Sequence, residues 1–157
     1  MIATPFHSER VQRDEYAAWL SDLANWTHAV TVSCQPSPMG YARSGSDMKK
    51  AATHFVHILN RRLLGRHHVA QGHRIASVAV MGMGAYQDNP HVHLAFESPS
   101  NLPHEKMRHA IEDAIKSTKG LGIEETVKPY VDEGWITYML DHGMEGLLVD
   151  ITTPAKH

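Results

Sequence analysis

Residues 90–97 read PHVHLAFE, a segment in which two histidines, His91 and His93, are separated by one valine and followed by an apolar run. In an extended strand, alternate side chains point to opposite faces, so the apolar residues share one face and His91 and His93 share the other. The sequence therefore predicts a strand that packs its apolar face against helices and projects two histidines from an open face. Two neighbouring imidazoles are a partial site for a divalent metal.

The segments on either side of PHVHLAFE predict the other strands of a sheet. Residues 28–34 (HAVTVSC) alternate in the same way, and residues 74–81 (RIASVAVM) are rich in valine and isoleucine. Residues 123–131 (IEETVKPYV) alternate again, although Pro129 lacks an amide hydrogen and favours a sheet edge or an irregularity. Residues 146–151 (GLLVDI) form a short apolar run in which we expect a last strand.

Three segments have apolar residues at spacings of three and four, which is typical of helices with one buried face. The first covers residues 8–24, and its stripe consists of Val11, Tyr16, Trp19, Leu20 and Leu23. The second is capped by Ser46 or Asp47 and ends at Gly65, and its stripe consists of Met48, Ala52, Phe55, Leu59 and Leu63. The third covers residues 103–119, with Met107, Ala110, Ile111, Ala114 and Ile115.

A fourth predicted helix, GWITYMLDHG at residues 134–143, presents a tyrosine. Its buried stripe consists of Trp135, Ile136, Met139 and Leu140. Tyr138 lies on another face, with Asp141 and His142 one turn further along the helix. Taken alone, this pattern is typical of an amphipathic helix with a surface tyrosine.

The order of these elements predicts the fold class. The core reads strand, helix, strand, strand, helix, strand, which is the split β-α-β pattern of ferredoxin-like α+β folds. Such a sheet is antiparallel, with helices on one face and the other face open for chemistry. We expect one domain over residues 1–157, in which a helix at 8–24 precedes a core at 28–151.

Composition limits the classes of function. Thirteen histidines in 157 residues make chance pairs common, so the His91–His93 pair needs support from elsewhere. The single cysteine, Cys34, excludes an internal disulfide and a cysteine-based zinc site, which fits a cytoplasmic protein. No stretch approaches the roughly 20 apolar residues needed to span a membrane, and the first residues lack the pattern of a signal peptide. We expect an intracellular protein without a membrane partner.

The formal net charge of −2 does not favour bulk attraction to nucleic acid, so binding would need a local basic surface. The densest candidate is residues 60–68, NRRLLGRHH. Two interpretations remain open for it. It is either a helix end whose cations favour the negative pole of the helix dipole, or a patch that binds phosphate.

Three motifs together resemble those of the HUH endonucleases, the family of rolling-circle replication initiators, relaxases and single-tyrosine transposases. AVTVSC at residues 29–34 resembles the first motif of that family, and PHVHLAF at 90–96 is similar to its His-hydrophobe-His motif. GWITYML at 134–140 resembles the motif in which a helix presents the nucleophilic tyrosine. The motifs occur in the family order and span residues 26–142.

The resemblance implies an activity and a role for each motif residue. His91 and His93 would hold a Mg²⁺ or Mn²⁺ ion that polarises the scissile phosphate. Tyr138 would attack the phosphate, leaving a 5′-phosphotyrosine link and a free 3′ hydroxyl. Tyr130 is a second candidate nucleophile, disfavoured because it precedes the helix. The implied substrate is single-stranded DNA or an origin hairpin, with host helicase and polymerase as candidate partners because the chain has no helicase-like phosphate loop.

Two positions depart from the replication initiators. Those proteins usually have a lysine three residues after the tyrosine, where this chain has Asp141. They also commonly have a third metal ligand, often glutamate, eight or nine residues before the first histidine, where this chain has Gly82 and Met83. The ligand set is therefore incomplete at the usual positions.

Four residues remain candidates for the third ligand. Single-tyrosine transposases take this ligand from the tyrosine helix, which points to His142 with Asp141 beside it. Gln87 and Asp88, in the turn before the histidine strand, are the other candidates. A carboxylate such as Asp141 suits a hard cation better than an imidazole does.

The leading hypothesis is a metal-dependent single-stranded DNA endonuclease and strand transferase, most like the nuclease domain of a replication initiator. A transposase or a relaxase of the same superfamily is an alternative. Two further alternatives are a non-catalytic DNA-binding module with a degenerate metal site and a ferredoxin-like domain whose histidines bind a transition metal for other chemistry.

Overall fold

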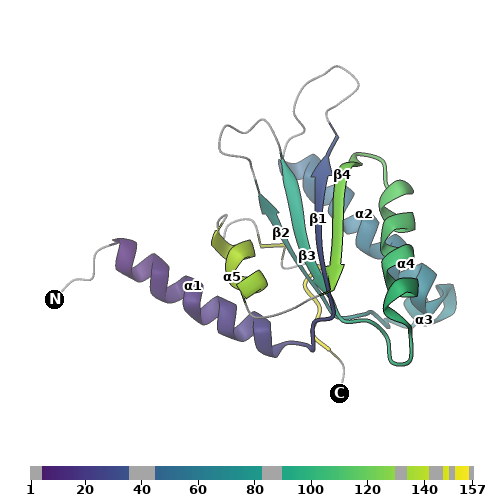
Figure 1. Ribbon diagram of the computed structural model, residues 1–157, viewed down its shortest axis with the longest axis horizontal. Helices are drawn as coiled ribbons and strands as arrows, with labels where there is room; N and C mark the ends of the chain where they lie inside the picture. The colour runs from purple at the N-terminus through teal and green to yellow at the C-terminus, as the bar shows by residue number, and fades with distance from the viewer. Residues whose placement is uncertain are drawn as a thin grey trace.

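The structure, a computed structural model, describes residues 5–35, 45–82, 90–129, 134–141, 147–148 and 151–155. Figure 1 shows a sheet with helices on both sides of it. The elements in chain order are α1 (Pro5–Asp22), β1 (His28–Cys34), α2 (Gly45–Leu64), α3 (Arg66–Ala70), β2 (Ser77–Gly82), β3 (His91–Phe96), α4 (His104–Lys116), β4 (Leu121–Pro129) and α5 (Gly134–Asp141).

The four strands form one antiparallel sheet in the order β2-β3-β1-β4. The predicted α+β class with an antiparallel sheet is confirmed. β1 lies inside the sheet, and its residues are buried on both faces except for the partly exposed Thr31. β4 forms an edge, as Pro129 predicted, and its pairing with β1 shifts register between Val32 and Cys34.

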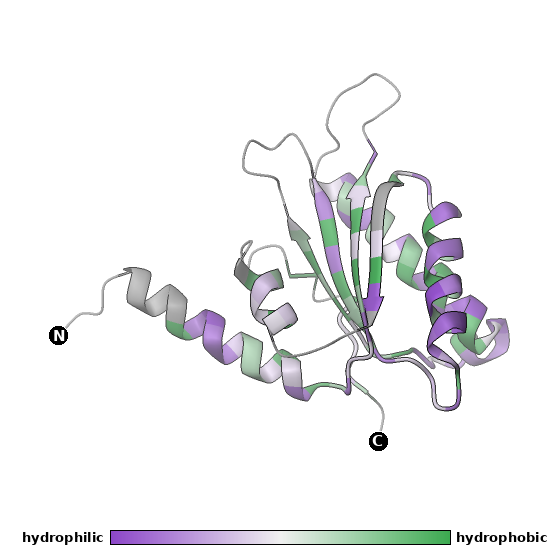
Figure 2. Cartoon of the chain, viewed as in Figure 1, coloured by the Kyte–Doolittle hydropathy of each residue, from purple (hydrophilic) through white to green (hydrophobic). Residues whose placement is uncertain are grey.

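One face of the sheet packs against α2 and α4 and forms the larger hydrophobic core. Most of the predicted stripe of each helix is buried there, including Phe55 and Leu59 of α2 and Met107 and Ile111 of α4. Leu63 and Ala110, at the margins of the stripes, are partly buried. Phe55 also contacts Phe96 of β3 edge to face, with ring centroids 5.9 Å apart. The alternation along the strands and the polar outer side of α4 can be followed in Figure 2.

The second face is not open, contrary to the expectation from the strand phase. α5 and the C-terminal half of α1 cover it on the β2 side and form a second hydrophobic cluster. Leu20 of α1 and Ile136, Met139 and Leu140 of α5 are fully buried in this cluster. The sheet therefore has helices on both faces, because the apolar residues of α5 need a surface to bury against.

The predicted stripe of α1 is largely wrong. Val11, Tyr16 and Trp19 are 42%, 43% and 47% exposed, while Leu20 is buried. The physical reason is that the C-terminal half of α1 packs on the second cluster through Ala17 and Leu20, so Tyr16 and Trp19 lie on a side of the helix that no neighbour covers. The N-terminal half of α1 extends beyond the sheet (Figure 1). Apolar residues at helical spacing predict a helix, but their burial depends on a neighbouring element that covers them.

The element boundaries differ from the predicted ones at several places. The second helix ends at Leu64, directly before Gly65, as predicted, and Gly65 has a positive φ of 84°, which favours glycine. The sequence pattern does not indicate the short helix α3 that follows. β2 begins three residues later than predicted, and β4 begins two residues earlier, at Leu121.

In place of the last predicted strand, the described residues show isolated bridges from Leu147 to Val80 and from Thr153 to Ser77. These bridges lie along the outer edge of β2, so the end of the chain shields part of that edge. Within the described ranges, no helix has the length and apolar character needed to cross a membrane.

Candidate functional site

His91 and His93 lie side by side on β3, as the strand phase predicted. Their ring centroids are 4.5 Å apart and the rings are inclined by 77°. Cross-strand neighbours on this face are Gly82 of β2 beside His91 and Thr31 of β1 beside His93. Antiparallel pairing places these side chains within reach of the imidazoles, although they lie far away in sequence.

Gly82 makes room for the His91 imidazole. A Cβ atom built on Gly82 would lie 2.7 Å from Nε2 of His91 and 3.1 Å from its Cδ2. These separations are shorter than van der Waals contact, so a larger residue would displace the ring. The glycine therefore has a steric role where replication initiators commonly have a carboxylate ligand.

Thr31 orients the His93 ring through a hydrogen bond. Its Oγ1 lies 3.0 Å from Nδ1 of His93. When Nδ1 carries the hydrogen and donates it to the hydroxyl, the lone pair of the ring is on Nε2, the form required for coordination of a metal. A hydroxyl on the neighbouring strand thus fixes the ring as the hydrogen-bonding partners of metal-binding histidines do.

α5 brings Trp135 and Tyr138 onto the His93 ring. The centroid of His93 lies 5.3 Å from that of Tyr138 and 5.5 Å from that of Trp135, with edge-to-face inclinations of 74° and 83°. Trp135 and Tyr138 stack with centroids 5.4 Å apart, and Nε1 of Trp135 donates to the carbonyl oxygen of Leu94 at 3.2 Å. This hydrogen bond attaches α5 to the histidine strand itself.

The exposures of these rings differ sharply. His93 is only 2% exposed, whereas Tyr138 is 47% exposed and His91 is partly exposed. The expectation that both histidines project from an open face is therefore wrong for His93, because the aromatic rings of α5 cover it. The tyrosine remains accessible to a large substrate at the border of the covered region.

Two imidazoles among the described residues, those of His91 and His93, are candidate ligands for a divalent metal. Gly82 leaves the space that the His91 ring occupies, and Thr31 satisfies the nitrogen of His93 that faces away from coordination, so both imidazoles fit a partial metal site. Over the described part of the chain, no three His, Cys, Asp or Glu side chains form a group that could hold a metal.

The candidates for a third ligand lie at or beyond the ends of the described segments. Asp141 is the last residue of α5, one turn after Tyr138, and the structure describes its backbone but not its side chain. His142, Gln87 and Asp88 lie outside the described residues, and so does the second candidate nucleophile, Tyr130.

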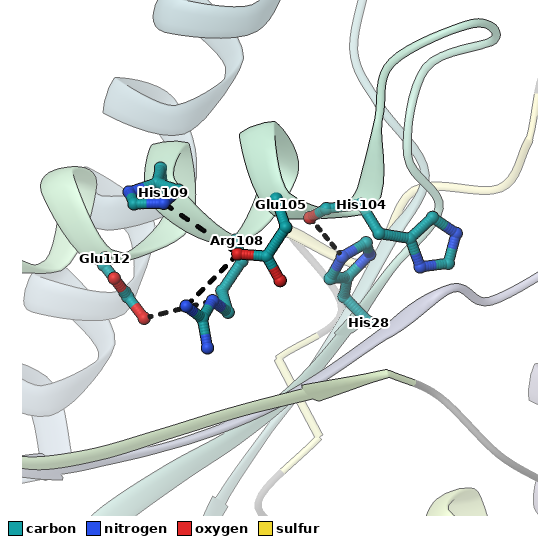
Figure 3. A network of polar contacts seen from close by, with 6 residues as sticks. All are labelled: His28, His104, Glu105, Arg108, His109 and Glu112. Atoms are coloured by element: carbon teal, nitrogen blue, oxygen red, sulfur yellow. Dashed lines mark hydrogen bonds and ion pairs between the residues drawn. The ribbon is translucent and has the colours of Figure 1, made fainter.

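A second pair of histidines lies at the other end of β1 and has a structural role. Nε2 of buried His28 donates to the carbonyl oxygen of His104 at 3.2 Å (Figure 3). Nδ1 of His28 lies 2.9 Å from Oγ1 of Thr27. Burial lowers the pKa of His28, and the nearby His104 lowers it further, whereas the hydrogen bond to the backbone of His104 raises it. His28 therefore joins β1 to the start of α4.

Comparison of the chain with protein-family models, with curated proteins and with solved structures found no match.

The sequence pattern does not single out three residues of the site. It places Thr31 on the face opposite Val30 and Val32, but the contact of Thr31 with His93 depends on the pairing of strands 62 residues apart. Gly82 is notable in the sequence only because it occupies a position at which replication initiators commonly have the third metal ligand. Trp135 is predicted to be core, whereas it is partly exposed and packs on His93. The signal for Thr31 and Gly82 is their place in a pairing register that a single strand does not reveal, and that for Trp135 is the packing of α5 on β3.

Proposed function

We propose that the chain is a metal-dependent endonuclease and strand transferase of the HUH type that acts on single-stranded DNA. The observation that carries this proposal is the packing of the His93 ring against both His91 and Tyr138, at 4.5 Å between the histidines and 5.3 Å to the tyrosine. His93 and Tyr138 are 45 residues apart in sequence. Their contact joins the two motifs on which the resemblance to that family depends.

The fold is consistent with this assignment. The order β2-β3-β1-β4 in an antiparallel sheet is the order of a ferredoxin-like split β-α-β unit, and we interpret the chain as such a unit with α5 added on the second face. In this arrangement the histidine strand occupies an inner position. A rigid inner strand suits a site whose ligands must hold their geometry.

Each residue of the site has a separate role in the proposed reaction. The exposed Tyr138 is the nucleophile: its phenol gives up its proton to solvent and its oxygen attacks phosphorus. The bond from phosphorus to the 3′ oxygen breaks, and that oxygen takes up a proton from solvent and leaves as a hydroxyl. Mg²⁺ or Mn²⁺ held by His91 and His93 would supply Lewis acidity at the scissile phosphate. Trp135 holds the tyrosine ring by stacking, and Thr31 holds the His93 ring by its hydrogen bond.

A covalent adduct is the decisive readout. The protein is incubated with Mn²⁺ and a pool of randomised single-stranded oligonucleotides carrying a 3′ label, and products are separated on a denaturing gel. We expect a labelled protein band, because the tyrosine retains the fragment downstream of the cleaved bond. The same pool with a 5′ label should yield free shortened DNA and no labelled protein.

Two variants make the test specific. Tyr138→Phe should abolish the adduct without loss of folding, because the hydroxyl belongs to a half-exposed side chain. Tyr16→Phe is the matched control, since Tyr16 is 43% exposed on another helix, and it should leave the adduct unchanged.

Other outcomes would replace the proposal. DNA binding without any adduct would favour a non-catalytic DNA-binding module. Tight uptake of Zn²⁺ or Ni²⁺ without DNA binding would favour a transition-metal site with other chemistry, since imidazole ligands suit those ions. An adduct of equal yield in Tyr138→Phe would refute the assignment of the nucleophile.

A further inference from the structure

The positive charge of the chain is concentrated in one segment. Residues 48–87 contain six of its fifteen lysine and arginine residues, five of its thirteen histidines and none of its seventeen carboxylates. This segment includes most of α2, together with α3 and β2. Although the net charge of the chain is −2, this segment therefore carries a local positive charge.

Four of these side chains form a line along α2, which we call the α2 stripe: Lys50, His54, His57 and Arg61. They follow one another at helical spacings of four, three and four residues, so they share one side of the helix. Lys50, His54 and His57 are exposed and Arg61 is partly exposed, while the core residues of α2, such as Phe55, occupy the opposite side. The stripe thus points away from the sheet and from His91.

The charges around the stripe are positive on every side for which an interaction is defined. Burial lowers the pKa of His57, and so do Arg61 and His54 on α2 and Arg74 in the segment before β2. Arg74 is held close by, because its Nη1 donates to the carbonyl oxygens of Val69 and His73 at 2.9 and 2.7 Å.

The neighbouring helix α4 shows the contrast. Its Arg108 lies between two carboxylates, 3.2 Å from Glu105 and 3.7 Å from Glu112 (Figure 3). Arg62, beside the stripe but directed to α4, lies 4.0 Å from Asp113. The cations of α4 are thus compensated along their own helix, whereas the carboxylate of α2, Asp47, lies one turn before Lys50 at the start of the stripe and none follows it between Lys50 and Arg61.

We propose that the α2 stripe, together with Arg74, binds the phosphate backbone of duplex DNA, on the side of the molecule opposite the histidine and tyrosine site. Lys50 and Arg61 are eleven residues apart, which corresponds to about 16 Å along a helix. The major groove of duplex DNA is about 12 Å wide, so a helix lying across it can place one cation on each of the two backbones.

The side chains of the stripe favour a duplex over a single strand. Single strands are bound mainly by stacking of unpaired bases on Trp, Tyr or Phe rings, and no such side chain is exposed among residues 45–82, where His54 and His57 are the exposed rings of the stripe. Contacts to phosphate alone need no access to the bases. The proposal goes beyond the nicking activity, and it stands or falls separately from it.

The test measures binding of the full chain to a labelled 20-base-pair duplex by fluorescence anisotropy over a series of salt concentrations. Lys50→Ala/Arg61→Ala should weaken binding about tenfold or more, since each cation makes a charge-assisted contact. The slope of log affinity against log salt should become shallower by about 0.9 for each phosphate that the variant no longer neutralises. Lys106→Ala/Lys116→Ala removes two exposed cations at nearly the same spacing on α4 and is the matched control.

The stripe also predicts a dependence on pH. Burial and the neighbouring cations lower the pKa of His57, and a bound phosphate would favour its protonation, so the affinity should rise as the pH falls from about 8 to about 6, and this rise should shrink in His57→Gln. An equal loss of binding in the α4 control would overturn the proposal. A single-stranded 20-mer that binds as tightly through the same residues would overturn the assignment to duplex. Because no cleavage is measured, failure of the Tyr138 adduct assay leaves this result unaffected.

Discussion

Replacement of Gly82 by alanine tests the metal site most directly. The added Cβ would lie 2.7 Å from Nε2 of His91, and ordinary contact between such atoms is about 3.5 Å. The imidazole must therefore move by roughly 0.8 Å, whereas metal–ligand distances tolerate only about 0.2 Å. Because the two residues are cross-strand partners, the ring cannot avoid the methyl group without leaving its position beside His93.

The effect on stability should be small in comparison. The clash involves the far end of a side chain that is partly exposed, so the ring can rotate outward at little cost. Alanine also loses less backbone entropy on folding than glycine does, by roughly 0.5–1 kcal/mol. We therefore expect the free energy of unfolding of Gly82→Ala to remain within about 1 kcal/mol of the native value, while Mn²⁺ affinity falls about 10- to 100-fold.

Isothermal titration with Mn²⁺ and urea unfolding measure the two quantities independently. Gly45→Ala is the matched control, because a Cβ there meets no atom within 4 Å. Combination of Gly82→Ala with His91→Ala should weaken Mn²⁺ binding no further than His91→Ala alone, since the glycine acts through the ring. Native Mn²⁺ affinity in a well-folded Gly82→Ala protein would refute the reasoning.

Three further perturbations address the surrounding residues. Thr31→Val should weaken Mn²⁺ binding about tenfold, because it removes the hydrogen-bond partner of His93 Nδ1, and Thr31→Ser should retain native affinity. If calorimetry finds no change in the valine variant, Thr31 does not orient His93 for metal binding. Trp135→Phe loses its hydrogen bond and should lower the free energy of unfolding by about 1 kcal/mol; it should also slow adduct formation by Tyr138, with an unchanged time course counting against positioning. Burial lowers the pKa of His28 below its unfolded value of about 6.5, so the unfolded chain takes up the proton first as the pH falls. The contribution of neutral His28 to the free energy of unfolding should be complete above about pH 6.5 and be lost as the pH falls through the folded-state pKa. Urea unfolding at about pH 7.5 and about pH 5.5 measures this loss of free energy, which should be smaller in His28→Gln than in the native protein.

Much of the fold follows from local patterns. The alternation at residues 28–34 and 91–96 predicted two strands that the structure confirms, and the buried stripes of α2 and α4 were predicted nearly residue by residue. The errors occur where burial depends on a neighbour. Tyr16 and Trp19 have helical spacing, yet nothing in a single helix indicates how far its partner extends.

The candidate site divides along the same line. The placement of His91 and His93 on one face is a property of strand geometry, because the period of two is local, and so it was determined by the sequence alone. The burial of His93 beneath α5 and its hydrogen bond to Thr31 were decided only by tertiary structure. These contacts join residues about 40 to 60 positions apart, and their register is set by the packing of whole strands and helices, which no local pattern encodes.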